Sequence, residues 1–146
     1  MKQRLDMAAA SPGAYKAMKA LSDYTRECGL EPKLLELVKT RASQINGCAF
    51  CLHMHTRDAR KGGETQERLD MLAAWREAPG YTERERAALA WTDALTLLTD
   101  GHAPDGVYDE VRAQFSEAEI ANLSLAIATI NAWNRLAVGM RFIPKV

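Results

Sequence analysis

The chain has 146 residues, of which 47% are hydrophobic and 26% charged, a composition typical of a soluble globular protein. Its 19 lysines and arginines are balanced by 19 aspartates and glutamates, so no net charge favours binding to nucleic acid or to an anionic membrane. With no membrane-spanning apolar run, no secretory signal and an odd set of 3 cysteines, we expect one cytoplasmic domain over residues 1–146.

Apolar residues recur at helical spacing along the whole chain, and no segment alternates with the period of a β-strand. Proline stands where a helix start tolerates it, and Asn-Gly and Gly-Gly pairs mark helix ends. The pattern therefore predicts an all-α domain of about seven helices, without repeats or linkers. The expected ranges are 14–24, 32–45, 48–61, 69–75, 82–98, 107–115 and 116–140.

Two of these helices begin with a capping box, in which the first and fourth side chains each bind a free backbone amide. The boxes are Thr82 with Glu85 and Ser116 with Glu119. Apolar residues cover most of the circumference of the last helix, more than a surface helix needs. We expect this helix to be central in the domain, to pack against a neighbouring subunit, or to do both.

Two cysteines separated by two residues, followed by a histidine one helical turn later, are the strongest chemical signal in the chain. At ~100° per residue, Cys51 lies at about 300° and His55 at about 340° from Cys48, so the three share one narrow stripe. His53 points elsewhere, near 140°, and is expected to be a surface or packing residue. We assign candidate chemistry to Cys48, Cys51 and His55.

A helix start favours thiolate over thiol, because free amides and the helix dipole stabilise the negative charge. This argument gives Cys48, nearer the helix end, the lower pKa. A thiolate that attacks a peroxide becomes a sulfenic acid, and a second cysteine can condense with it to a disulfide. The spacing of the pair supplies that second thiol without a large conformational change.

Glu36 is expected to lie beside His55 if the Asn46-Gly47 turn folds the two helices antiparallel. At 1.5 Å per residue, Glu36 lies about 16 Å before the turn and His55 about 12 Å after it. Glu36 could then orient the imidazole directly or through a water molecule. The alternative is an ordinary solvated glutamate on a helix.

Other interpretations of the cysteine motif have different requirements. Haem attachment needs the histidine directly after the second cysteine, where this chain has Leu52. A thioredoxin-like site needs a βαβ pattern, and no strands are predicted. Zinc binding by two cysteines and a histidine stays open, as does a pair of core cysteines without chemistry. Cys28 is expected to be a small buried hydrophobe.

The arrangement of Glu36, eleven intervening residues, Cys48-x-x-Cys51, three further residues and His55 resembles the signature of the AhpD-like alkylhydroperoxidases, within the carboxymuconolactone decarboxylase family. The similarity covers most of the chain after about residue 30. It extends to the segments 41–51, 54–56, 90–92 and 130–135.

This resemblance implies an all-helical fold that assembles as trimers or larger rings, with peroxidase activity through the paired cysteines. By the family pattern, Cys51 attacks the peroxide, Cys48 resolves the sulfenic acid, and Glu36 with His55 forms a proton relay. One departure is Phe50, where well-studied peroxidases of this type carry a histidine. The decarboxylase branch generally lacks the cysteine pair, so we do not expect lactone decarboxylation.

The sequence therefore predicts a thiol-dependent peroxidase that reduces alkyl hydroperoxides through Cys48 and Cys51, with a Glu36/His55 relay. No metal, flavin or other cofactor is expected, because the sulfurs carry the two electrons. An external dithiol of the lipoyl or thioredoxin type would reduce the Cys48–Cys51 disulfide after each turnover. The protein is expected to be a homo-oligomer, trimeric or hexameric. The alternative is a redox sensor or disulfide-exchange protein without efficient turnover.

Overall fold

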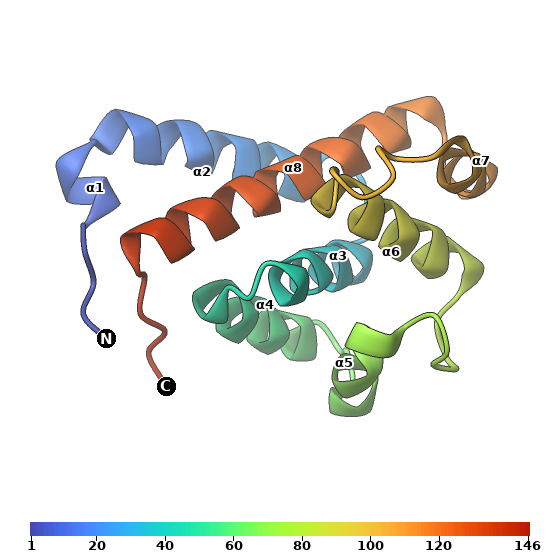
Figure 1. Ribbon diagram of the computed structural model, residues 1–146, viewed down its shortest axis with the longest axis horizontal. Helices are drawn as coiled ribbons and strands as arrows, with labels where there is room; N and C mark the ends of the chain where they lie inside the picture. The colour runs from blue at the N-terminus through green and yellow to red at the C-terminus, as the bar shows by residue number, and fades with distance from the viewer.

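The computed structural model describes residues 1–146 and is entirely helical, as predicted (Figure 1). Eight α-helices and one short 3₁₀ segment replace the seven expected helices. No helix is both long enough and apolar enough to cross a membrane. The elements are α1 (Met7–Ala10), α2 (Pro12–Glu27), α3 (Pro32–Ile45), α4 (Ala49–Lys61), α5 (Gln66–Met71), the 3₁₀ segment Leu72–Ala74, α6 (Glu83–Thr96), α7 (Asp105–Gln114) and α8 (Glu117–Met140).

The helix boundaries follow the local chemistry of the chain. Both predicted capping boxes form, at the start of α6 and at the start of α8. Proline occupies the first position of α2 and of α3, where its missing amide hydrogen costs no hydrogen bond. The additional helix α1 is capped by Asp6, whose carboxylate accepts hydrogen bonds from the amides of Ala8 and Ala9. Sequence periodicity could not indicate this helix, because it has only 4 residues.

The long helix α8 is central, and α2 lies alongside it in the opposite direction (Figure 1). Leu123 and Ile127 are fully buried, where α8 meets α3 and α6. Val138, near the end of α8, is 51% exposed, so the apolar circumference is not covered completely within one chain. The extended N-terminal segment joins this end of α8, where the Arg4 amide donates to the Met140 carbonyl at 2.9 Å.

Three buried clusters stabilise the bundle. The largest joins α3, α6, α7 and α8, and the second packs the Leu72–Ala74 segment against α3 and α6. The third is small and contains both Cys48 and Cys51, packed against Ala42, Ile130 and Ala137. The cysteine pair therefore lies inside the bundle, between the α3–α4 hairpin and the C-terminal half of α8.

A buried carboxylate fixes α3 relative to the second cluster. Asp93 on α6 accepts from Arg41 at 2.7 Å, from Arg76 at 2.6 Å and from the Trp75 indole at 3.2 Å. The Asp93 side chain is only 9% exposed, and its charge is neutralised by partners from two separate segments, α3 and residues 75–76.

Candidate active site

The α3–α4 hairpin carries every residue of the predicted signature. Helix α3 ends at Ile45, and Gly47 turns the chain with a φ of +62°, a conformation that glycine adopts without steric cost. The Cys48 amide then donates to the Ser43 carbonyl at 3.0 Å, which closes the turn. The two helices pack side by side as an antiparallel pair, as expected from the sequence (Figure 1).

Cys48 caps α4 and Cys51 lies in the first turn of that helix. The Cys48 sulfur accepts a hydrogen bond from the Cys51 backbone amide at 3.4 Å, in the role that serine or aspartate usually has. Cys48 is 1% exposed and Cys51 is 2% exposed, and both are free thiols. The pair is close, desolvated and oriented by the helix start.

The two thiols have opposite pKa shifts, which result from their contact. A hydrogen bond from the Cys51 thiol, aided by the amides of Cys51 and Phe50 and by Asn134, outweighs burial and lowers the pKa of Cys48 to about 6. The Cys48 sulfur and burial raise the pKa of Cys51 well above its ordinary value. At neutral pH the pair therefore shares one negative charge that resides mainly on Cys48, as expected for the thiol nearer the helix end.

Glu36 and His55 are in direct contact across the hairpin. The His55 Nδ1 and the Glu36 Oε2 are 2.9 Å apart, and Lys39 approaches the other carboxylate oxygen at 3.1 Å. Burial acts to raise the pKa of Glu36, but the His55 hydrogen bond and the Lys39 charge hold it below its ordinary value. With Nδ1 engaged by the carboxylate, the other ring nitrogen, Nε2, is free for proton transfer.

A largely buried network of asparagines adjoins the cysteines and was not predicted from the sequence. The Asn46 amide donates to the side-chain oxygens of Asn131 and Asn134, both at 2.9 Å. The Asn134 amide then donates to the Ser43 hydroxyl at 3.0 Å, and it also lowers the pKa of both thiols. Two asparagines three residues apart in a helix of mostly apolar residues were the available signal.

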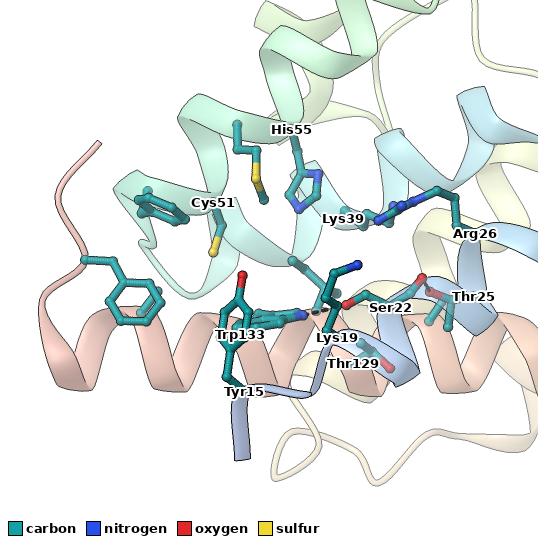
Figure 2. Close-up of a pocket in the computed structure, with 16 residues that line it drawn as sticks. Tyr15, Lys19, Ser22, Thr25, Arg26, Lys39, Cys51, His55, Thr129 and Trp133 are labelled. Carbon is teal, nitrogen blue, oxygen red and sulfur yellow. Dashed lines mark hydrogen bonds between the residues drawn. The ribbon is translucent and has the colours of Figure 1, made fainter. Parts of the chain in front are cut away.

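A pocket of about 320 Å³ opens in front of Cys51 (Figure 2). Cys51 and His55 line it, whereas Cys48 does not. The opposite wall consists of α2 and α8, which contribute Tyr15 and Trp133, among others. Of the two sulfurs, only that of Cys51 is available to a molecule in this pocket.

Of the other residues noted in the sequence, His53 and Cys28 lie outside the pocket, whereas Phe50 is part of its lining. Cys28 packs against the largest core cluster, and its sulfur donates to the Thr25 carbonyl at 3.1 Å. Phe50 lines the pocket and packs edge-to-face on Phe142 with ring centres 5.5 Å apart. No three His, Cys, Asp or Glu side chains are grouped as metal ligands, so the geometry does not support the zinc alternative.

Comparison with known proteins identifies a matching family and a relative that is similar over nearly the whole chain. Residues 12–94 match the carboxymuconolactone decarboxylase family. The uncharacterized protein YdfG of Bacillus subtilis is 41% identical over 140 residues, which cover 96% of this chain and 95% of YdfG.

Two solved structures have the same architecture. A protein of unknown function from Agrobacterium tumefaciens, provisionally described as the antioxidant defence protein AhpD, is 46% identical, with a TM-score of 0.97 and 99% of each chain covered. The alkylhydroperoxidase AhpD core of a peroxidase-related protein from Ralstonia eutropha JMP134 is 20% identical, with a TM-score of 0.83, covering 95% of this chain and 74% of that one. The chain belongs to the carboxymuconolactone decarboxylase family and has the AhpD-like fold.

Proposed function

We propose that this protein is a thiol peroxidase that reduces organic hydroperoxides to alcohols, with Cys51 as the attacking residue and Cys48 as the resolving residue. The observation that carries the proposal is the position of Cys51, which faces the pocket beside His55 and contacts a thiol with a lowered pKa behind it. Membership of a family with peroxidase-related members supports the same reaction class.

Because the pKa of Cys51 is raised, its thiol must transfer its proton to a neighbouring group before it can attack. The Cys51 proton can pass to the Cys48 sulfur, to which it is already hydrogen-bonded, or to the free nitrogen of His55. Either transfer places the negative charge on the sulfur that faces the pocket. Glu36 stabilises an imidazolium if His55 takes the proton, because its carboxylate is only 2.9 Å from Nδ1.

In the first step, the Cys51 thiolate attacks the terminal peroxide oxygen and the O–O bond breaks. The alkoxide that leaves takes a proton from the His55 imidazolium or from water, which gives the alcohol and a Cys51 sulfenic acid. The Cys48 sulfur then attacks the sulfenic sulfur, the S–S bond forms, and hydroxide leaves as water after protonation. The two cysteines supply both electrons, and an external dithiol reduces the disulfide by exchange.

Steady-state consumption of cumene hydroperoxide with dihydrolipoamide as reductant tests this proposal. Cys48→Ser and Cys51→Ser should abolish turnover, and Cys28→Ser is the matched control that should retain it. Loss of turnover in Cys28→Ser to the same degree would contradict the assignment. Reversible disulfide formation without turnover in the unmodified protein would instead identify a redox sensor or an exchange partner.

A further inference from the structure

The pocket in front of Cys51 has two chemically different ends (Figure 2). Near Cys51 lie Tyr15 and Trp133, whose rings meet edge-to-face with centres 6.0 Å apart. Toward the other end lie Lys19, Arg26 and Lys39, and no carboxylate lines the pocket. A volume of about 320 Å³ is within the range of small-molecule sites, ~300–1,000 Å³.

Helix α2 contributes to this polarity, because it lines the pocket with Tyr15 near its start and with Arg26 near its end. At 1.5 Å per residue, Lys19 lies about 6 Å beyond Tyr15, and Arg26 about 16 Å beyond it. The Trp133 indole donates to the Ser22 hydroxyl at 2.7 Å, which holds this face of α2 against α8. A ligand with its reactive group at Cys51 would therefore place its far end among the cations.

The cations differ in their availability to a ligand. The Lys39 side chain is 15% exposed and is engaged by Glu36 at 3.1 Å. The Lys19 and Arg26 side chains are 58% and 68% exposed and share one carboxylate, Asp23, at 3.2 Å and 3.6 Å. Lys19 and Arg26 thus share a single acidic partner, which leaves a net positive charge on this part of the pocket lining.

We infer that the preferred substrates are hydroperoxides with an apolar or aromatic body and a carboxylate at the opposite end, which Lys19 and Arg26 of α2 recognise. This inference rests on the proposed peroxidase function, and it names the substrate class of that site. The aromatic walls bury the body of the substrate, and the carboxylate fixes which end faces Cys51.

Binding of an unreactive product separates recognition from chemistry. The probes are 4-(2-hydroxypropan-2-yl)benzoate and its methyl ester, titrated calorimetrically into the Cys48→Ser/Cys51→Ser protein at low salt. We expect the carboxylate to bind about five- to tenfold more tightly than the ester, as two partly exposed ion pairs allow. Lys19→Met/Arg26→Met should remove this preference, whereas Lys16→Met, an exposed lysine of α2 outside the pocket, should keep it.

A second variant tests the charge argument in the opposite direction. Asp23→Asn frees Lys19 and Arg26, so it should increase the preference for the carboxylate severalfold. Equal affinity for the two probes, or an Asp23→Asn protein that binds the carboxylate no better, would overturn the inference.

Turnover of the corresponding hydroperoxides distinguishes failure of the peroxidase proposal from failure of carboxylate recognition. Turnover of the carboxylated and esterified cumene hydroperoxides at equal kcat/KM, together with equal probe binding, would retain the peroxidase and reject carboxylate recognition. Selective binding of the carboxylate probe without turnover of either hydroperoxide would reject the peroxidase and retain the anion-recognising pocket.

Discussion

The lowered pKa of Cys48 gives a quantitative test of the site. The structure lowers this pKa from 9.0 to about 6. At pH 7, a thiol with a pKa of 9 is about 1% ionised and one with a pKa of 6 about 90% ionised, a roughly 90-fold difference. Intrinsic nucleophilicity falls by roughly 20-fold over the same three units, so the net gain at pH 7 is only about fourfold. The advantage grows as the pH falls, because an ordinary thiol loses its thiolate first.

The direct measurement is thiolate absorbance at 240 nm in the reduced Cys28→Ser protein, between pH 4 and pH 9. We expect a single thiolate with a midpoint near pH 6, because the pKa of Cys48 is lowered and that of Cys51 is raised. The thiolate persists above the midpoint and is lost as the pH falls through it. The Cys48→Ser/Cys51→Ser protein supplies the baseline.

Substitution of the second thiol tests the cause of the shift. Cys51→Ala removes the largest contribution to the low pKa of Cys48, so the midpoint should move upward. Cys48→Ser should bring the pKa of Cys51 down from its raised value. A midpoint that stays near 9 in the reduced protein, or that is insensitive to Cys51→Ala, would refute the coupled-thiol reasoning.

Three further predictions concern the residues around the pair. His55→Ala should slow peroxide turnover about 100-fold or more, and Glu36→Gln should slow it less, because the imidazole remains. Unchanged turnover rates would mean that both residues have only structural roles. Asn134→Ala should lower the free energy of unfolding, measured in urea, by about 1–3 kcal/mol, because the Asn46 amide loses one acceptor. It should also raise the pKa of Cys48, and a loss of stability without that rise would make Asn134 purely structural. Leu123→Ala should cost about 2–5 kcal/mol by leaving a cavity in the largest cluster, and a smaller loss would mean that the cluster collapses around it.

Local rules predicted much of the fold. Capping boxes at Thr82 and Ser116 and the Gly47 turn set helix boundaries from a few adjacent residues, and the structure has them where the sequence indicated. The contact between Glu36 and His55 followed from rise per residue and one antiparallel turn, since both are regular over that distance.

Other features depended on contacts between distant segments. The asparagine network joins Asn46 to residues 85 and 88 positions away, and periodicity within one helix cannot indicate such pairs. The pocket likewise requires the packing of α2 on α8, because residues 15–26 face the cysteines only once the bundle is assembled. The raised pKa of Cys51 arises from a sulfur–sulfur contact in a buried setting, which the position of each thiol along the helix does not indicate.

The cysteine pair and part of the pocket wall are on different helices, which has a consequence for how the protein can evolve. The cysteine pair, Glu36 and His55 belong to the α3–α4 hairpin, whereas part of the opposite wall of the pocket is on α2, which packs mainly on α8 and α1. Mutations on the inner face of α2 can alter which molecules are admitted and leave the thiols undisturbed. Under the proposed function, substrate range and chemistry are thus separable traits, and exchanging α2 between homologues is a way to transfer one without the other.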